Sequence, residues 1–122
     1  MRGDEYLTKS DQYALVYNKG KSWRNDLVVM KVMLNGLVSA RYGFSVSKRV
    51  GKAVTRNRVK RLLREILRIK PLEPGWDIVF IARPLAASAN YAALEKSISN
   101  LLSRAHLLRA PGETINLGLG VL

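Results

Sequence analysis

Three stretches of the chain have the hydrophobic pattern of β-strands. Residues 27–34 form an apolar, β-branched run interrupted only by Lys31, and residues 41–47 alternate apolar with small or polar side chains. Residues 76–82 are almost wholly apolar, and Pro84 follows closely. The first two strands are separated by a segment that begins with Asn35-Gly36, a strong tight-turn signal. We therefore expect residues 27–34 and 41–47 to pair as an antiparallel hairpin.

Three other stretches have the spacing of amphipathic helices. Ser10-Asp11 and Gly20 mark the ends of the first, in which Tyr13, Val16 and Tyr17 share one face. Pro71 ends the second, at residues 55–69, and the third is expected at residues 90–105. The apolar stripe of the second comprises Val59, Leu62, Leu63, Ile66 and Ile69. That of the third comprises Leu94, Ile98, Leu101, Leu102 and Ala105.

The elements follow one another in the order α-β-β-α-β-α, which predicts an α+β fold. The chain has 122 residues, enough for one modest core. We place a single domain at residues 1–109. Residues 110–122 have no strong period, and this tail either frays or docks as an extra strand.

The distribution of charge adds a functional indication, because the positive charge is concentrated in one part of the chain. The chain has 21 Lys and Arg against 9 Asp and Glu, a formal net charge of +12. Between Arg41 and Lys70 lie 11 basic residues and one acid, Glu65, so this quarter of the chain carries +10. In the helix at residues 55–69 the basic side chains Arg56, Lys60, Arg64 and Arg68 repeat every fourth position, away from the apolar stripe. Such a face is typical of a nucleic-acid binding surface.

Composition excludes several classes of protein. There is no cysteine, hence no disulfide framework, thiolate metal site or cysteine nucleophile. No apolar run is long enough to span a membrane, and the first residues lack the apolar core of a secretory signal. We expect a soluble cytoplasmic domain. The Arg-rich helix could also lie on a membrane surface, but its apolar stripe is better used in closing the core over the strands.

The sequence offers no self-contained active site. The acids are scattered, and the adjacent pair Asp4-Glu5 stands near the chain start. The sole histidine, His106, has the basic neighbours Arg104 and Arg109 rather than a carboxylate partner. No phosphate-loop spacing is present. Binding chemistry is richer, since arginines pair with phosphates and Tyr13, Tyr17 and Trp23 could line a groove that stacks bases. For the two tyrosines, core packing is an equally good interpretation.

The run Gly43-Phe44-Ser45-Val46-Ser47-Lys48-Arg49, followed by Gly51 and by Thr55-Arg56-Asn57-Arg58-Val59-Lys60-Arg61-Leu62-Leu63-Arg64-Glu65, closely resembles the bacterial ribonuclease P protein component. The resemblance covers about residues 4–108. It implies a two-layer α+β sandwich with a central sheet and a left-handed βαβ crossover, the ribosomal protein S5 domain 2-like fold. A left-handed crossover is rare, because the twist of β-sheets favours right-handed connections between parallel strands.

The resemblance also implies a function. The chain would be the protein subunit of an endonuclease that matures the 5′ end of tRNA, binding a catalytic RNA and the 5′ leader of precursor tRNA. It would act as a monomer, one to one with the RNA. The catalytic groups and the Mg²⁺ ions would belong to the RNA, with no cofactor required by the chain itself.

Position by position, the resemblance assigns two sets of residues. The RNA-binding set is Ser47, Lys48, Arg49, Arg56, Asn57, Arg58, Lys60, Arg61, Arg64 and Arg68. The leader-binding cleft is Tyr13, Tyr17, Trp23, Asn25 and Lys31.

Two features depart from the family pattern. Lys31 stands where an aromatic occurs in some relatives, and the apolar residues 115–122 have no family counterpart. Two alternatives remain open: another basic RNA-binding protein, such as a ribosomal protein or an RNA chaperone, and an independent nuclease.

Overall fold

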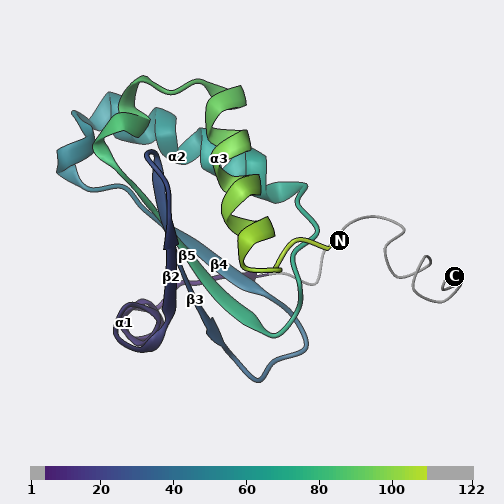
Figure 1. The fold of residues 1–122 in the computed structure, drawn as a ribbon. Helices are drawn as coiled ribbons and strands as arrows, with labels where there is room; N and C mark the ends of the chain where they lie inside the picture. Colours follow the sequence, from purple (N-terminus) through teal and green to yellow (C-terminus); the bar gives the residue numbers. More distant parts are fainter. Residues whose placement is uncertain (1–4, 110–122) are drawn as a thin grey trace, which may run out of the picture.

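The computed structural model describes residues 5–109, in which three helices and five strands form an α+β fold (Figure 1). The strands are β1 (Glu5–Tyr6), β2 (Lys21–Arg24), β3 (Val28–Leu34), β4 (Arg41–Ser45) and β5 (Trp76–Ala82). The α-helices are α1 (Ser10–Lys19), α2 (Ala53–Arg68) and α3 (Tyr91–Arg104), and two short 3₁₀ helices are η1 (Lys48–Val50) and η2 (Pro84–Ser88). The tail placed at residues 110–122 lies outside the described residues.

The strands form one mixed sheet in the order β1-β4-β5-β3-β2. The expected hairpin between residues 27–34 and 41–47 is wrong, because β5 lies between these two strands. It pairs antiparallel with β3 and parallel with β4. The Asn35-Gly36 turn does form, with Gly36 at φ 70° and Leu37 N–H donating to Asn35 Oδ1 at 2.7 Å. The β5 strand, apolar except for Asp77, takes the central position, where both of its faces are covered.

The unit β4-α2-β5 is a parallel crossover through the Arg-rich helix, as the resemblance implies. Its left hand stays an expectation drawn from that resemblance. Two strands escaped prediction. β2 follows α1 immediately and pairs antiparallel with β3, while the two-residue β1 pairs in parallel with β4 at the opposite edge.

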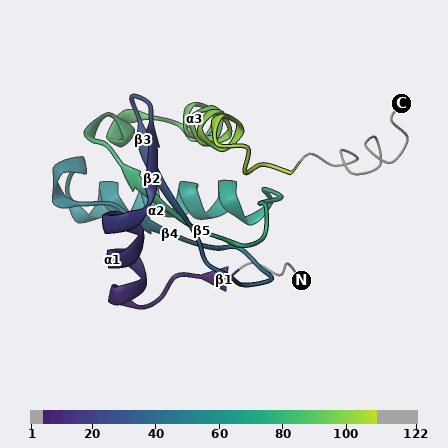
Figure 2. The ribbon, with the colours of Figure 1, turned by 60° about the horizontal axis from the view of Figure 1, so that its bottom comes forward.

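Helices cover the two faces of the sheet unequally (Figures 1 and 2). On one face α2 and α3 enclose the main core around Met30, Ile78 and Phe80, all fully buried. On the other face α1 alone packs, through Val16, against Val79. The elements therefore form a layer of two helices, the sheet and a single helix over part of its other side.

The apolar stripe of α2 differs from the prediction at one end. Val59, Leu63 and Ile66 are buried as expected, but Leu67 completes the stripe, whereas Ile69 is 67% exposed. Ile69 is the residue that ends α2, where the chain turns toward Pro71 and leaves the helical spacing. No helix within residues 5–109 is long and apolar enough to cross a membrane.

A buried ion pair fixes the start of β5. The carboxylate of Asp77, 2% exposed, accepts two hydrogen bonds from Arg41, Nε to Oδ1 at 2.8 Å and Nη2 to Oδ2 at 2.6 Å. Asn35 Nδ2 donates a third, at 2.9 Å. Because Arg41 and Asp77 are direct neighbours in the parallel pairing, this pair sets the register of β4 against β5.

The C-terminus of α3 is closed by a left-handed residue. His106 has φ 59°, and the next residue, Leu107, donates its N–H to Leu102 O at 2.8 Å, the bond that defines a Schellman motif. The turn brings Leu107 back against the core, where it is 2% exposed.

Candidate nucleic-acid interface

The face of the sheet under α1 carries the two tyrosines. Tyr13 and Tyr17 project from one side of α1, are half-buried, and pack beside Met33 and Ile81. Gly43 on β4 makes room for the first ring. A Cβ on Gly43 would stand 2.1 Å from the Tyr13 hydroxyl oxygen, so no larger residue fits without moving Tyr13. The tyrosines thus close a small apolar cluster while part of each residue stays accessible, so their geometry is compatible with both interpretations weighed from the sequence.

Lys31 joins this aromatic pair. It lies on β3, and its Nζ donates to the main-chain carbonyl of Tyr17 at 3.2 Å while standing 5.8 Å from the centre of the Tyr17 ring. The carbonyl belongs to the last turn of α1, where the helix dipole attracts a cation. An ammonium group is therefore held against an aromatic ring, an arrangement suited to a base with its phosphate.

The hydroxyl of Tyr13 is less acidic than an ordinary phenol. Burial raises its pKa above the usual value, and the backbone N–H of Phe44, which opposes this shift, has a smaller effect. The hydroxyl also donates to Leu7 O at 3.3 Å. Tyr13 therefore stays a neutral aromatic across the physiological range.

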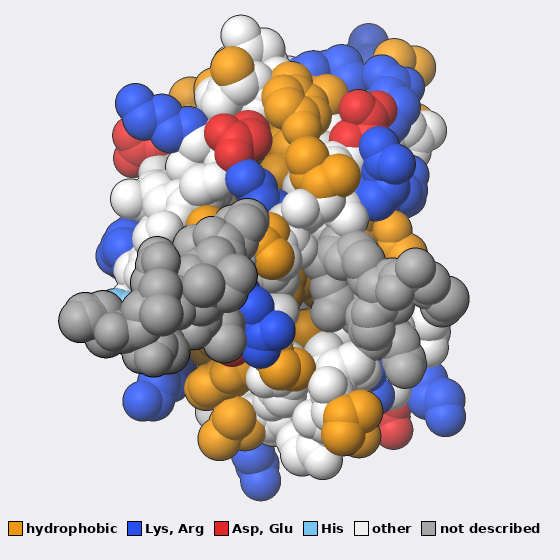
Figure 3. Space-filling view, turned by 90° about the vertical axis from the view of Figure 1, so that its right-hand side faces the viewer, with side chains coloured by type: hydrophobic (Ala, Val, Ile, Leu, Met, Phe, Trp, Pro, Cys, Tyr) orange, Lys and Arg blue, Asp and Glu red, His pale blue; other side chains and the backbone are white. Residues whose placement is uncertain are grey.

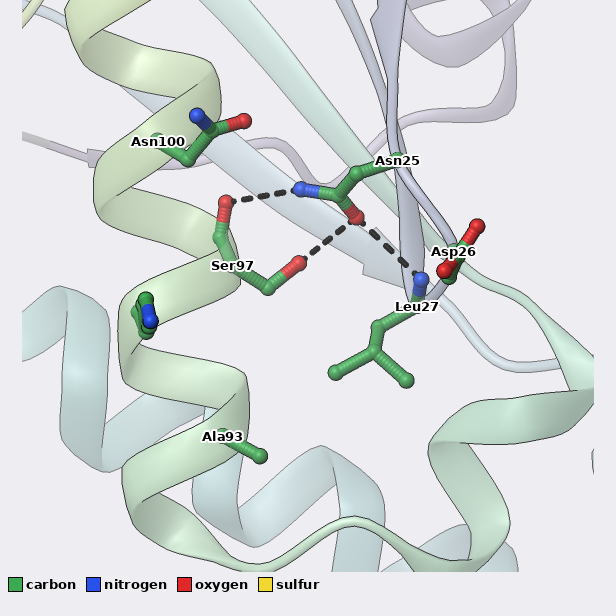
Figure 4. Close-up of a pocket in the computed structure, with 7 residues that line it drawn as sticks. Asn25, Asp26, Leu27, Ala93, Ser97 and Asn100 are labelled. Atoms are coloured by element: carbon green, nitrogen blue, oxygen red, sulfur yellow. Dashed lines mark hydrogen bonds between the residues drawn. The ribbon is translucent and has the colours of Figure 1, made fainter.

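Trp23 and Asn25, expected in the same cleft, do not lie there. Trp23 is opposite Met30 in the β2–β3 ladder and packs against the main core on the α3 side. Asn25 stands at the β2–β3 turn, where its Nδ2 donates to Ser97 O at 3.1 Å and its Oδ1 accepts from Ser97 Oγ at 2.7 Å (Figure 4). Asn25 thus ties the turn to α3. The cleft side of β2 carries Ser22 and Arg24 instead, residues that the sequence reasoning missed.

The basic residues of α2 face outward on the opposite side of the sheet. Its exposed surface presents Asn57, Arg61, Arg64 and Arg68, with Glu65 beside them. Arg56 and Lys60 are half-buried along one flank. In the space-filling view, blue side chains gather at the upper right, where acidic side chains are few (Figure 3). The outermost row thus runs 57–61–64–68 rather than along the predicted 56–60–64–68 spacing.

Arg58 and Arg56 of the predicted RNA-binding set donate hydrogen bonds to main-chain carbonyls of the protein. Arg58 donates to Ala87 O at 2.5 Å and to Ala89 O at 3.2 Å, so that its guanidinium joins α2 to η2 and to the residue that follows η2. Arg56 Nε donates to Gly51 O at 3.1 Å, just before the helix. Since each guanidinium has further N–H groups, contact with RNA remains open to both, but their positions are set by the fold.

A short helix leads into α2 and presents three more residues of the set. Lys48 and Arg49 are exposed on η1, and the hydroxyl of Ser47 caps it by accepting from Arg49 N at 3.3 Å. Gly51 follows with φ 147°, a conformation that L side chains rarely adopt. This glycine turns the chain so that Lys48 and Arg49 precede the N-terminus of α2, in continuity with its basic face.

An aromatic cluster at the β1 edge was also missed. The rings of Tyr6 and Tyr42 lie 5.0 Å apart, and that of Phe44 lies 5.9 Å from Tyr42 and 6.4 Å from Tyr6. Tyr6 is 47% exposed. A two-residue strand gives no periodicity, so only the aromatic residue itself could have pointed to this cluster.

Acidic and histidine side chains do not converge within residues 5–109: no three of them stand where they could hold a metal ion. His106, the residue weighed as a general base, is exposed at the turn that ends α3. The described surface is therefore equipped for binding, with aromatic and cationic groups on the α1 face and a basic row on the α2 face.

Comparison with known proteins agrees with this geometry. A family model described as Ribonuclease P matches residues 1–106. A ribonuclease P protein component of Dehalococcoides mccartyi is 45% identical over 113 residues, covering 93% of this chain and 94% of the relative. The ribonuclease P protein component of Clostridioides difficile is 45% identical over 101 residues, covering 80% of this chain and 89% of the relative.

Solved structures give the same result. The ribonuclease P protein of Staphylococcus aureus superposes with a TM-score of 0.78 at 30% identity, covering 85% of this chain and 97% of that protein. The ribonuclease P protein of Thermotoga maritima superposes with a TM-score of 0.74 at 31% identity, covering 81% of this chain and 96% of that protein. These superpositions show that both proteins have the same fold as this chain.

Proposed function

The chain belongs to the ribonuclease P protein family and is a protein subunit of that ribonucleoprotein, and we propose that it binds both the catalytic RNA and the 5′ leader of precursor tRNA. In this role it promotes the endonucleolytic step that matures the tRNA 5′ end. We place the assembly in the cytoplasm, with one copy of the chain per RNA.

The observation that carries the proposal is the Tyr17–Lys31 contact on the α1 face. A half-buried ring with an ammonium group held beside it offers a stacking surface and a phosphate partner together. Tyr13 continues the surface toward Gly43. A single-stranded leader, with bases unpaired and backbone charged, is a substrate of this chemistry.

The basic row on α2 is assigned to the catalytic RNA. Arg61 and Arg64 are exposed, and their planar guanidinium groups match the oxygens of a phosphate. The helix that carries this row, α2, and the helix that carries the tyrosines, α1, lie on opposite sides of the sheet (Figure 2), so the protein can contact both RNAs at once.

The hydrolytic chemistry is assigned to the RNA, together with the Mg²⁺ ions that the reaction uses. The nine acids of the chain are dispersed, and the acids within residues 5–109 form no cluster that would hold such an ion. The chain's own contribution is electrostatic: its charge of +12 reduces the repulsion between two polyanions that must approach each other.

The test is cleavage of a precursor tRNA by a bacterial ribonuclease P RNA at low magnesium, with and without this chain. Stimulation is expected, and binding competition should show that a precursor with its leader is preferred to mature tRNA. An absence of stimulation contradicts the proposal. Equal binding of both tRNAs would instead favour a general RNA-binding protein, and cleavage by the chain alone would favour an independent nuclease.

A further inference from the structure

A second concave surface lies where strand β2 forms the edge of the sheet, on the side covered by α3. It is a groove of about 470 Å³ where the end of β3 and the start of β2 meet the C-terminus of α3. Trp23 and Trp76 line it together, and they are the two tryptophans of the chain. The other lining residues are Lys19, Lys21, Val32, Met33, Leu34, Ala105 and Leu107.

The groove combines an apolar lining with two cationic side chains. Its lining contains two indole rings and aliphatic side chains, and its charged members are Lys19 and Lys21, both exposed. None of the nine lining residues is acidic. A nucleotide has a matching division, with a flat base of low polarity and an anionic phosphate, whereas a purely apolar peptide would leave both ammonium groups without a counter-charge.

The groove is continuous with the α1 face. Met33 packs in the cluster around Tyr13 and Tyr17 and also lines the groove. Lys19 stands two residues after Tyr17, at the end of α1, and also lines the groove. A strand of RNA that leaves the tyrosines along α1 therefore meets Lys19 and then the indole rings.

We propose that this groove binds an unpaired nucleotide of the 5′ leader, farther along the strand than the nucleotides on the α1 face. The base enters between the indole rings, and the flanking phosphates contact Lys19 and Lys21. The inference rests on the proposed function, because it assumes that the leader crosses the α1 face. It adds a second contact with the leader, in the groove that lies beyond the end of the α1 face.

Tryptophan fluorescence, excited at a wavelength that tyrosine does not absorb, tests this directly, since both tryptophans of the chain lie in the groove. A single-stranded RNA of about ten nucleotides, within the usual site size of such proteins, is titrated into the full chain while anisotropy of a labelled copy reports total binding. The tryptophan emission should fall as binding saturates. Trp23→Phe and Trp76→Phe should each leave one emitter that still responds.

Lysine variants supply the second readout. Lys21→Gln should lower the slope of log affinity against log salt by about 0.7, the contribution of one phosphate on a single strand. The matched control is Lys96→Gln, which removes the same charge from an exposed position on α3 outside this groove, and it should leave the slope unchanged.

Each other outcome overturns the proposal. Binding without any change in tryptophan emission, or an equal loss of slope in both lysine variants, removes the groove from the leader path and leaves the proposed function standing. No binding by anisotropy contradicts both. If the tryptophan emission of a chain ending at Arg109 responds to RNA whereas that of the full chain does not, residues 110–122 occupy the groove. If the emission instead varies with protein concentration, a second copy of the chain occupies it.

Discussion

The hydroxyl of Tyr13 rests against Gly43, so closely that a Cβ on that glycine would stand 2.1 Å from the oxygen. Gly43→Ala should therefore displace the Tyr13 ring, at a cost of about 1–3 kcal/mol for an overpacked contact. We expect weaker leader binding from this variant.

The double variant separates displacement from a general loss of stability. Once Tyr13→Ala has removed the ring, the added methyl of Gly43→Ala has space, so leader affinity should fall no further than in Tyr13→Ala alone. Affinity is measured with a labelled leader oligonucleotide. Additive losses in the double variant would show that Gly43 acts independently of Tyr13.

Arg58 and Arg61 should behave differently although both belong to the predicted RNA-binding set. Arg58→Ala removes two hydrogen bonds from a charged donor to Ala87 O and Ala89 O, so it should lower the free energy of unfolding by about 2 kcal/mol. Arg61→Ala alters an exposed side chain and should leave stability unchanged while reducing the salt slope of catalytic-RNA binding by about 1. Denaturant unfolding and salt-dependent binding measure the two effects. Equal stability of both variants would contradict this division.

The Arg41–Asp77 pair predicts a large effect from one carboxylate. Asp77→Ala leaves the Arg41 guanidinium and the Asn35 amide without their common acceptor, which should cost about 3 kcal/mol of unfolding free energy. The control is Asp26→Ala, the loss of an exposed carboxylate at the β2–β3 turn, which should change stability little. Thermal unfolding of the two variants checks the difference, and similar melting temperatures would show that the pair is not stabilising.

His106 is a residue in a left-handed conformation that favours glycine. His106→Gly should raise the free energy of unfolding by about 1 kcal/mol, because the steric cost of φ 59° disappears. The same variant should keep full stimulation of precursor cleavage, since binding is assigned to other residues. Loss of that stimulation in a stabilised variant would give His106 a functional role.

The Lys70–Glu95 ion pair predicts a small dependence of stability on pH. The hydrogen bond from Lys70, assisted by one from Ser99, lowers the pKa of Glu95 below its usual value. A lowered pKa means that the pair stabilises the fold above the pKa of the unfolded state, about 4.3, and that this contribution is lost as the pH falls through the folded value. The melting temperature of Glu95→Gln should be slightly below that of the wild type at pH 7 and equal to it at low pH. A constant difference across this range would contradict the assignment.

Local sequence patterns correctly predicted the helices and strands whose bounds depend on their own residues and on immediate neighbours. The strand at residues 76–82 was placed with its observed bounds, because the apolar run ends close to Pro84. The hairpin was wrong for a non-local reason. The Asn35-Gly36 turn is real, but the partner that completes β3 comes from 42 to 54 residues downstream, and no turn signal contains that information.

The candidate site shows the same limit on a smaller scale. Tyr13, Tyr17 and Lys31 meet as expected, whereas Trp23 lies on the other face because it stands opposite Met30, and its neighbour Ser22 stands opposite Lys31. A shift of one residue in a strand exchanges the faces, so the choice depended on a register that the sequence did not reveal. The outward direction of Arg61 followed from helical spacing, but the internal bonds of Arg58 required the position of η2.

The central place of β5 in the sheet also determines when the sheet can be completed during synthesis of the chain. Neither β3 nor β4 has its main partner until Ala82 has been made, so a nascent chain that ends at α2 lacks the central strand that joins β2-β3 to β1-β4, yet it already carries most of the positive charge. Pairing across such separations is slow compared with helix formation. An arginine-rich helix is then available to RNA before the sheet beneath it is complete. The protein's RNA partner could thus meet a chain that has not finished folding, and refolding in the presence and absence of that RNA would measure whether it accelerates closure of the sheet.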